Sequence, residues 1–514
     1  MPERLRALGR WTVGVPEGSG SHELTRFVLL RFLGLVYLVA FLVLVHQWGP
    51  LVGRQGLLPV GTFLDRMESR HGSAAILKYL SIFWVGHSDA FMTSLAWVGV
   101  ALSTAVVAGW ANSILLAGLW ALYLSFVNVG QVWYGYGWET QLLETGFLAI
   151  FLGSPLDPRP FPRRPAPIQV LWLYRWLAFR IFLGAGLIKL RGAASWRDLT
   201  ALDYHFETQP IPNPLSPWFH FMPHGVHALG CLWNHAVELG VPFLVFWPPR
   251  LRRLAGVLLV SFQVLLILSG NLSFLNWLTI VPCLACFDDG FWRRILPARL
   301  VRLAGLPPEF RAPGRVQNAV AWSLVAVISL LSLGPVSNLL SADQKMNFSF
   351  SSLHLVNTYG AFGWVGQERH ELILEGTQDA RITAETRWRA YEFKAKPGDP
   401  ARRLPIVSPY HYRLDWQIWF AAMESPGENP WLVHLLWKLL SNDEEALGLL
   451  ANRPFPAGPP TYLRVELYRY RFAPPGSPGP WIRERIRAWL PPLSAHDPGF
   501  RQFIQDMGWP LGRE

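Results

Sequence analysis

The sequence predicts a polytopic α-helical membrane bundle of about nine spans, followed by an α+β extracytoplasmic domain with a sheet core. Hydrophobic residues make up 51% of the 514 residues and charged residues only 16%, which is too apolar for one soluble domain. The charge is also uneven, because residues 1–334 carry 26 basic and 16 acidic side chains whereas residues 335–514 carry 20 and 19. The first region excludes charge as lipid does, and the second is mixed as an aqueous domain is.

The composition excludes several other classes of protein. The net charge of +11 lies almost entirely in the first region, where arginines at the cytoplasmic ends of membrane helices explain it better than nucleic-acid binding does. Only three cysteines and many aromatic residues exclude a disulfide scaffold and a disordered chain. The sequence contains no P-loop, dinucleotide fingerprint or Ser-His-Asp elbow. We therefore expect no cofactor, no metal ion and no nucleic-acid partner.

A helix that crosses a bilayer needs roughly 20 mostly apolar residues. About nine stretches of the first region are predicted as spans, some of them short: 27–45, 90–108, 113–129, 138–152, 168–190, 226–247, 254–268, 272–287 and 319–333. The expected domains are a cytoplasmic tail at 1–25, a multi-pass transmembrane domain at 26–337 and an extracytoplasmic domain at 338–514.

The distribution of arginine predicts the orientation of the bundle, because cytoplasmic connections carry an excess of basic residues. With a cytoplasmic N-terminus, the tail and every even-numbered connection hold the arginine-rich stretches: Arg4, Arg6, Arg10, Arg159, Arg163, Arg164, Arg250, Arg252, Arg253, Arg293, Arg294, Arg299, Arg302, Arg311 and Arg315. The opposite connections hold fewer basic residues per length: Arg54, Arg66, Arg70, Lys78, Arg191 and Arg197. An odd number of spans leaves the C-terminal domain in the periplasm or a lumen.

The C-terminal domain combines strand and helix patterns. Alternation typical of strands occurs at 371–375, 391–396 and 462–472. Aromatics and leucines at helical spacing predict helices at 414–423 and 430–440, the second beginning at Asn429-Pro430. The Pro- and Gly-rich stretches 453–460 and 473–480 predict loops. These patterns indicate an α+β domain built on a sheet.

Ionisable side chains inside the predicted spans are costly and are therefore functional candidates. They form an expected intramembrane polar network of Glu139, Glu144, Arg175, Arg180, Lys189, His235 and Glu238. Three carboxylates match three cations, so ion pairing that holds helix to helix is the simplest interpretation. A histidine-containing stripe also follows one helical face: His224, His227, Cys231, His235 and Glu238. The stripe lacks a complete ligand motif, which leaves a metal site as the weaker interpretation.

The connection at 192–222 is unusually rich in aromatic residues and proline. Its candidate functional residues are Trp196, Tyr204, His205, Phe206, Glu207, Pro210, Pro212, Asn213 and Pro214. Prolines stiffen such a segment and aromatics give it contact area, so it could be a protein-contact surface, a lid, part of an active site, or an ordered loop packed on the bundle. In the C-terminal domain we expect a docking or salt-bridge surface of Arg369, Glu371, Arg402, Arg403, Arg413, Asp415 and Trp416.

Four segments, in this order, resemble the lipase maturation factor family. They are WYGYGWETQLLETGFLAIFL (133–152), RWLAFRIFLGAGLIKLRGAASWRDLTALDYHFETQPIPNPLSPWFH (175–220), NTYGAFGWVGQERHELILEGTQD (357–379) and YEFKAKPGDPARRLPIVSPYHYRLDWQIWFAAM (391–423). Family members are multi-pass proteins of the endoplasmic reticulum membrane, and the best understood is needed for secreted lipases to reach their active, assembled form. The resemblance implies a chaperone-like maturation factor with a lipase-like, secreted or exported client.

Some features of the sequence differ from an animal lumenal factor. Arginine outnumbers lysine 40 to 6, the C-terminal domain has no cysteine, and the tail Leu511-Gly512-Arg513-Glu514 is no lumenal retention signal. We therefore expect a bacterial relative in the inner membrane. Cys283 and Cys286 have redox spacing but end an apolar span, which favours small buried thiols. Because the C-terminal domain has no thiol, we expect it to assist a client non-covalently.

A weaker resemblance indicates an enzyme. The stretch Ala185-Gly186-Leu187-Ile188-Lys189-Leu190 is similar to an A-G-x-x-K-L stretch of the vitamin K-dependent γ-carboxylase, in which the matching lysine is a base. This resemblance implies a membrane-embedded enzyme centred on Lys189 and His205. The alternative for Lys189 is a structural lysine whose ammonium reaches the outer interface.

Overall fold

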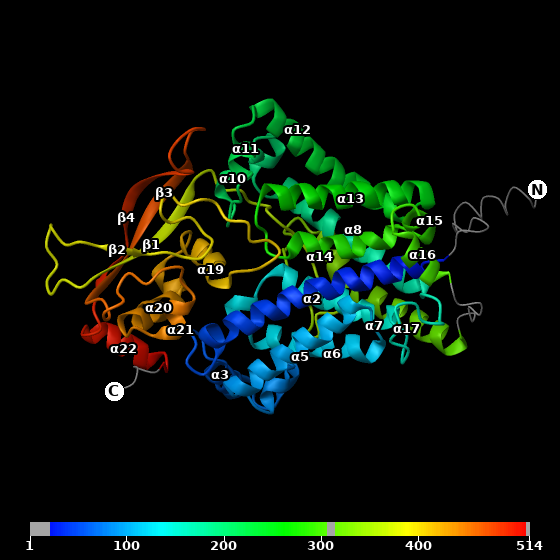
Figure 1. Ribbon diagram of the computed structural model, residues 1–514, viewed down its shortest axis with the longest axis horizontal. Helices are drawn as coiled ribbons and strands as arrows, with labels where there is room; N and C mark the ends of the chain where they lie inside the picture. The colour runs from blue at the N-terminus through cyan, green and yellow to red at the C-terminus, as the bar shows by residue number, and fades with distance from the viewer. Residues whose placement is uncertain (1–20, 306–313, 510–514) are drawn as a thin grey trace, which may run out of the picture.

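The computed structural model describes residues 21–305 and 314–509. A helical bundle carries a sheet-containing domain at one end, which we call the outer domain (Figure 1). The first described residues lie at the opposite end of the bundle (Figure 1). Arg4, Arg6, Arg10, Arg311 and most of the expected tail at 1–25 lie outside the described residues.

Six helices of the described chain are long and apolar enough to cross a membrane. They are α2 (Glu23–Val52), α5 (Asp89–Ala108), α8 (Ile168–Arg191), α12 with the turns that continue it (His224–Phe246), α13 (Pro249–Ser269), and α17 with α18 (Arg315–Leu340). The shortest has 20 residues, which at about 1.5 Å per residue matches a hydrocarbon core roughly 30 Å thick. A multi-pass bundle is therefore confirmed.

The expected count of about nine spans is corrected to six candidate membrane helices that are long enough in the described chain. The other three predicted stretches form shorter helices: α6 (Ser113–Val129), α7 (Gly137–Leu152), and α14 (Leu275–Cys283) with a 3₁₀ turn at Leu284–Cys286. Helices of 16 or 17 residues reach only about 25 Å. Gly130 and the 3₁₀ turn Gln131–Tyr134 interrupt the chain between α6 and α7, and apolar composition alone does not reveal such interruptions.

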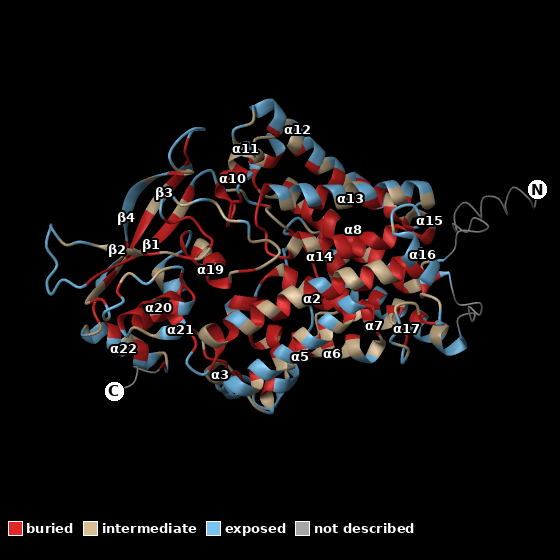
Figure 2. Cartoon of the chain, in the orientation of Figure 1, coloured by how far each residue is buried: buried red, intermediate tan, exposed pale blue. Residues whose placement is uncertain are grey.

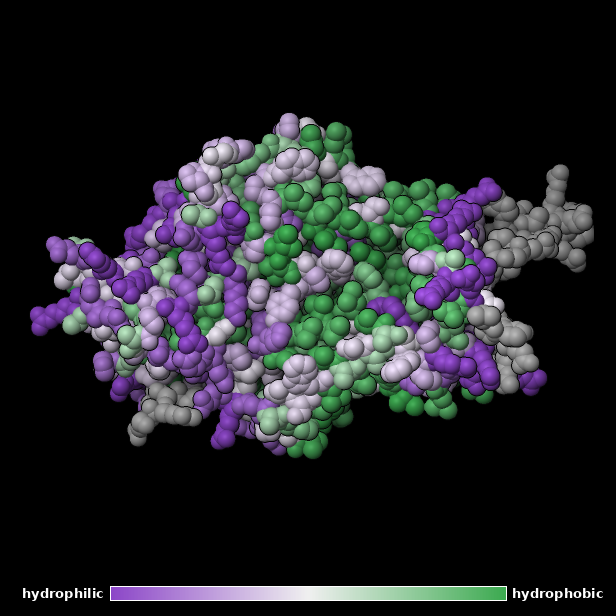
Figure 3. Space-filling view, viewed as in Figure 1, coloured by the Kyte–Doolittle hydropathy of each residue, from purple (hydrophilic) through white to green (hydrophobic). Residues whose placement is uncertain are grey.

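The outward faces of the bundle are apolar. Figure 3 shows hydrophobic side chains gathered over the bundle, between the hydrophilic outer domain and a hydrophilic opposite end. Leu229, Trp322 and Leu330 are 66%, 61% and 68% exposed. By contrast, α8 is buried along most of its length in the middle of the bundle (Figure 2). Such an exposed apolar surface over the bundle fits lipid and not water, so the chain is a multi-pass membrane protein.

Short helices connect the long ones at both ends of the bundle. Those near the outer domain are α3 (Val60–His71), α4 (Ala74–Lys78), α9 (Ala194–Arg197), α10 (Ala201–Thr208) and α11 (Ser216–His220), and those at the opposite end are α15 (Asp289–Trp292) and α16 (Ala298–Ala304). The Asp289 carboxylate accepts the Leu24 amide at 2.9 Å, which stabilises the N-terminus of α2. The start of the described chain is thereby fixed at the end away from the outer domain.

The outer domain contains one antiparallel sheet in the order β2-β1-β3-β4. Its strands are β1 (Arg369–Thr377), β2 (Arg389–Tyr391), β3 (Tyr462–Phe472) and β4 (Trp481–Leu493). The predicted strands at 371–375 and 462–472 are confirmed, but the one at 391–396 ends at Tyr391. The sequence pattern missed β4, because this edge strand exposes most of its side chains and shows no apolar alternation.

Helices complete the outer domain and join its core to the bundle. They are α19 (Arg413–Ala421), α20 (Pro430–Leu440), α21 (Glu444–Gly448) and α22 (Pro498–Asp506). Trp138 at the start of α7 packs edge-on against Trp416 of α19, with ring centroids 4.9 Å apart. Trp138 also stacks on Tyr136 at 4.4 Å. The apolar core is therefore continuous between the two parts of the molecule.

Candidate functional site

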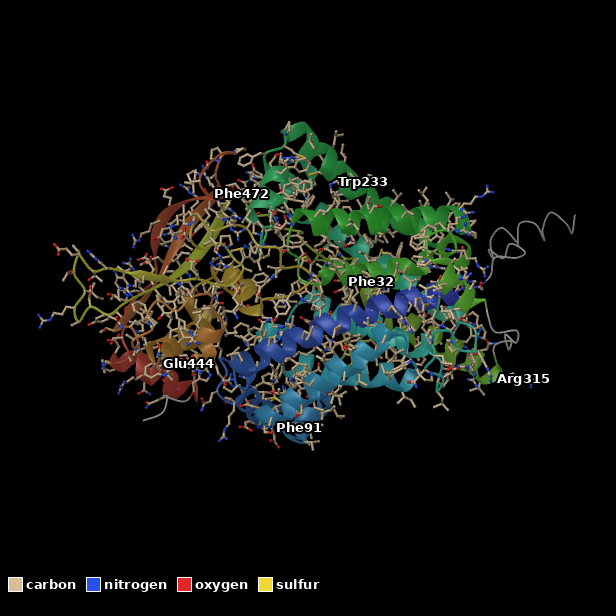
Figure 4. All side chains as sticks on the ribbon, in the orientation of Figure 1. Phe32, Phe91, Trp233, Arg315, Glu444 and Phe472 are labelled. Carbon is tan, nitrogen blue, oxygen red and sulfur yellow. The ribbon has the colours of Figure 1, made fainter. Side chains whose placement is uncertain are left out.

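The candidate site is the junction between the bundle and the outer domain, together with the cavity beneath it. Figure 4 places Phe472 of β3 beside α10 and α11, Trp233 on α12, and Arg315 at the far end of the bundle. Three clusters of buried charges lie at this junction. Each joins segments far apart in the sequence. Together they hold Glu139, Glu144 and Arg180 of the predicted intramembrane network and Arg369, Glu371 and Arg413 of the expected outer-domain surface.

The first cluster pairs the bundle with α19. Arg413 donates to the Glu139 carboxylate at 2.8 Å, and both side chains are completely buried. The Arg413 guanidinium lies 3.5 Å from the centre of the Tyr134 ring, a cation–π contact. The Tyr123 hydroxyl donates to the second oxygen of Glu139. Glu139 therefore pairs with the outer domain and not with a bundle cation.

The second cluster fixes the chain that follows α18. Glu144 forms a buried ion pair with Arg180 of α8. Its other oxygen accepts the Asn357 amide at 3.0 Å, the Asn357 side chain at 3.0 Å and the Tyr359 hydroxyl at 2.6 Å. Arg180 also donates to the Asn357 carbonyl at 2.8 Å. The segment at 357–360 is thus held inside the bundle by charged groups.

Gly184 of α8 and Gly192, directly after its last residue, leave room for this segment. A Cβ added at Gly184 would collide with the Tyr359 carbonyl, and one at Gly192 with the Gly363 carbonyl. Beside them, the Ala193 amide donates to the Gly363 carbonyl at 2.8 Å. Close backbone approach needs the missing side chains, so α8 and the segment at 357–363 are shaped to each other.

The third cluster lies on β1 of the outer domain. Arg369 donates to the main-chain carbonyls of Glu207, Gln209 and Pro210. It also pairs with Glu371, which accepts Lys396 at 2.6 Å. The carbonyls at the end of α10 accept hydrogen bonds from the Arg369 guanidinium, and the Glu371 carboxylate neutralises its charge. β1 is thereby attached to the connection at 192–222.

Five of the seven residues expected as a docking or salt-bridge surface are buried and so form no exposed docking surface, but Arg369, Glu371 and Arg413 do form salt bridges. Arg369, Glu371, Arg413, Asp415 and Trp416 are buried, whereas Arg402 is half-buried and Arg403 exposed. Burial raises the pKa of the Asp415 carboxyl, and the amides of Lys396 and Ala395 oppose that shift by hydrogen bonding. Charged patterns do not distinguish a solvent-exposed pair from one inside a domain junction.

Lys189 lies in a cavity of about 230 Å³ among α8, α10, α12, α13 and α14. Its ammonium is 2.6 Å from Glu238 and 3.1 Å from Asn234, whose amide reaches the other Glu238 oxygen at 2.9 Å. A catalytic base must lose its proton, whereas this contact stabilises the charged ammonium. The geometry favours a structural lysine.

His205 lines the same cavity and packs edge-on against Phe362 at 4.9 Å. Burial and the nearby charge of Lys189 lower the pKa of His205 to about 4. The imidazole is therefore neutral near pH 7, with one nitrogen able to donate a hydrogen bond and the other able to accept one.

The histidine stripe does not converge on one point. His224 and His227 both contact Asp203, at 3.0 and 2.7 Å, while His235 bonds the Trp196 carbonyl at 3.1 Å. Over residues 21–305 and 314–509, no group of three or more His, Cys, Asp or Glu side chains is placed to hold a metal ion. Cys231, Cys283 and Cys286 are buried free thiols.

A further member of the predicted polar network, Arg175, has other partners. Arg175 donates to the Ala285 carbonyl at 2.9 Å and lies over the Trp172 ring. The sequence analysis missed Asn357, Tyr359 and Asn271. The Asn271 side chain accepts the amides of Val407 and Ser408 at 2.8 and 3.0 Å, and a lone asparagine in an apolar stretch was the available signal.

The connection at 192–222 is mostly interior. Its predicted functional residues are buried except for half-buried Tyr204 and exposed Pro214: Trp196, His205, Phe206, Glu207, Pro210, Pro212 and Asn213. These seven side chains therefore do not lie on the exposed surface of the connection. The exposed apolar side chains of this connection are Leu215, Trp218 and Phe221, and Trp218 and Phe221 border a groove with the β3–β4 loop and Arg403. Aromatic content alone does not reveal which rings face outward.

Known proteins are similar to this chain over nearly its full length. Residues 24–294 match the lipase maturation factor transmembrane domain, and residues 355–491 match the lipase maturation factor C-terminal domain. Lipase maturation factor 1 of Homo sapiens is 47% identical over 540 residues, covering 99% of this chain and 95% of the human protein. Lipase maturation factor 2 of Homo sapiens is 29% identical over 613 residues, covering 95% and 85%. No solved structure matches the chain.

Proposed function

The chain belongs to the lipase maturation factor family, and we propose that it assists the folding and assembly of an exported, lipase-like client. The observation that carries this proposal is the 47% identity to lipase maturation factor 1, which covers both the bundle and the outer domain. The three buried clusters support it, because they hold the outer domain in a fixed position on the membrane. A client leaving the membrane would meet a preformed surface.

We infer that the client contact is non-covalent and lies beside α11. The outer domain has no cysteine, so it cannot exchange a disulfide. Trp218 and Phe221 are 62% and 43% exposed beside the β3–β4 loop. Partly folded clients expose apolar surface, and exposed aromatic rings bind such surface with large contact area. The enzyme alternative has no support in the pairing of Lys189 with Glu238.

We also infer the orientation and the membrane. The described arginine-rich connections lie at the end opposite the outer domain, as Arg315 shows (Figure 4), which supports a cytoplasmic N-terminus and a periplasmic or lumenal outer domain. The first described residues and the outer domain lie at opposite ends of the bundle (Figure 1). The chain must therefore cross the membrane an odd number of times. At least one shorter apolar helix would then cross with the six long ones. The 40 arginines against 6 lysines favour a bacterial inner membrane over the endoplasmic reticulum.

Reporter fusions test the orientation. A reporter active only outside the cytoplasm should give signal after Glu514, which follows the outer domain in the sequence, and no signal after Arg164, which lies at the opposite end of the bundle beside the start of α2. The same reporter after Pro214, beside the outer domain, should give signal and serves as the positive control. Signal after Arg164 with none after Glu514 would reverse the orientation. Silence at both positions would mean an even number of crossings.

Crosslinking in native membranes tests the function. We expect the full-length tagged chain to capture an exported hydrolase of the lipase class, and the yield of that hydrolase in active form to fall when the chain is absent. Recovery of no exported protein, together with normal hydrolase activity in its absence, would contradict the proposal.

A matched pair of variants locates the contact. The double change Trp218→Ala and Phe221→Ala should lower capture of the client several-fold at an unchanged protein level. Trp322→Ala removes an equally exposed ring from the lipid-facing side and should leave capture unchanged. Equal capture by the unaltered protein, the double variant and Trp322→Ala would place the client contact elsewhere.

A further inference from the structure

The cavity that contains Lys189 has a polar end and an apolar body. Lys189 is close to the last residue of α8, Arg191, at the end of the bundle that carries the outer domain. Ile181 and Phe182 line the cavity about two helical turns deeper. The polar side chains Lys189, His205 and Glu238 therefore lie at the depth of the membrane interface, and the apolar body extends toward the bilayer centre.

The body of the cavity is unsuited to water. Phe182, Phe262 and Leu266 line it with hydrocarbon, and ordered water needs several polar partners. The polar side chains Gln263, Asn276 and Thr279 also line it, but they bond one another or other protein groups. Leaving about 230 Å³ empty would forfeit packing contacts on every side. An apolar occupant fits this space better than either water or vacancy.

The cavity faces the lipid side of the bundle. Val226 and Trp233 of α12 and Leu265 of α13 line it and are each at least 40% exposed. Trp233 lies on α12 (Figure 4), and Figure 3 shows hydrophobic side chains over this part of the bundle. Lipid is present there at the concentration of a solvent, so acyl chains are the most abundant apolar molecules at the opening.

We propose that this cavity binds one acyl chain of a membrane phospholipid, with the ester carbonyl at Lys189 and His205. The ammonium donates to two acceptors, Glu238 and Asn234, which leaves one of its three protons for a further acceptor. Neither ring nitrogen of His205 has a hydrogen-bond partner among the described residues. An ester carbonyl accepts from such donors without adding a charge to the buried Lys189–Glu238 pair. The bound chain would fill the bundle beneath the 357–363 segment.

A photoreactive lipid tests the proposal on the full chain. The probe is phosphatidylethanolamine with a diazirine near the end of one acyl chain, supplied in phosphatidylethanolamine vesicles containing the purified protein. We expect crosslinks at Phe182, which is 2% exposed and lines the cavity, so lipid on the outer surface does not reach it. Absence of crosslinks at Phe182 in the unaltered protein would overturn the proposal.

Two variants with the same substitution sharpen the test. Leu266→Trp places a large ring in the cavity and should reduce crosslinking at Phe182 several-fold. Leu268→Trp places that ring on the lipid-facing side of α13 and should leave crosslinking unchanged. Equal crosslinking in both variants, each monodisperse after purification, would overturn the proposal. Competition by unlabelled free fatty acid, with none by unlabelled phosphatidylethanolamine, would assign the cavity to a free acid and also overturn it.

Discussion

Replacing Glu144 with alanine is expected to destabilise the protein by about 3–5 kcal/mol, the usual loss when one partner of a buried ion pair is removed. The change leaves the Arg180 guanidinium buried without its carboxylate. It also removes the acceptor of two Asn357 donors and of the Tyr359 hydroxyl. Thermal unfolding of the full chain in detergent measures the loss. Limited proteolysis should also cut the segment at 357–363 faster.

An exposed glutamate provides the control. Glu68→Ala on α3 changes a solvent-exposed side chain and should leave the unfolding midpoint unchanged. Asn357→Ala keeps the ion pair but removes the side-chain donor, so its effect should lie between the two. If the Glu144→Ala and Glu68→Ala proteins had the same unfolding midpoint, the cluster around Glu144 would contribute little to stability.

The sequence predicted the helices better than it predicted their partners. Long apolar runs identify α2, α8 and α13 because hydrophobicity is a local property of the chain. Glu144 and Arg180 were identified as intramembrane charges for the same reason. Their additional partners, Asn357 and Tyr359, follow more than 170 residues later along the chain. No local pattern marks those two as interior residues.

The errors at the candidate site have a common physical cause. Arg369 and Arg413 have the composition of a charged surface, yet each lies buried against a different segment of the membrane half. Likewise, Phe206 in the 192–222 connection points inward while Trp218 is exposed. A buried charge costs little only when it is paired, and a sequence shows the charge without its pair. The four segments that carry the family resemblance contain both partners of each contact: Arg369 with the Glu207 carbonyl, and Arg413 with Glu139.

The ion pair between Glu139 and Arg413 is expected to behave as one unit. Arg413→Met leaves a buried carboxylate with only the Tyr123 hydroxyl, and Glu139→Leu leaves a buried guanidinium. Each single change should cost about 3–5 kcal/mol. The double change removes both charges and substitutes apolar side chains of similar volume, which is often nearly neutral in buried pairs.

The double variant should therefore lose less stability than the two single variants combined, by about 2 kcal/mol or more, as measured by unfolding of the full chain in detergent. Some loss will remain, because the Tyr123 hydroxyl and the Trp133 carbonyl each lose a buried partner, at about 1–3 kcal/mol per group. The exposed pair Arg159–Asp157 is the control, and its two alanine changes should show no measurable coupling. Purely additive losses at Glu139 and Arg413 would mean that α19 is held to the bundle by aromatic packing around Trp416, and that the charges act independently.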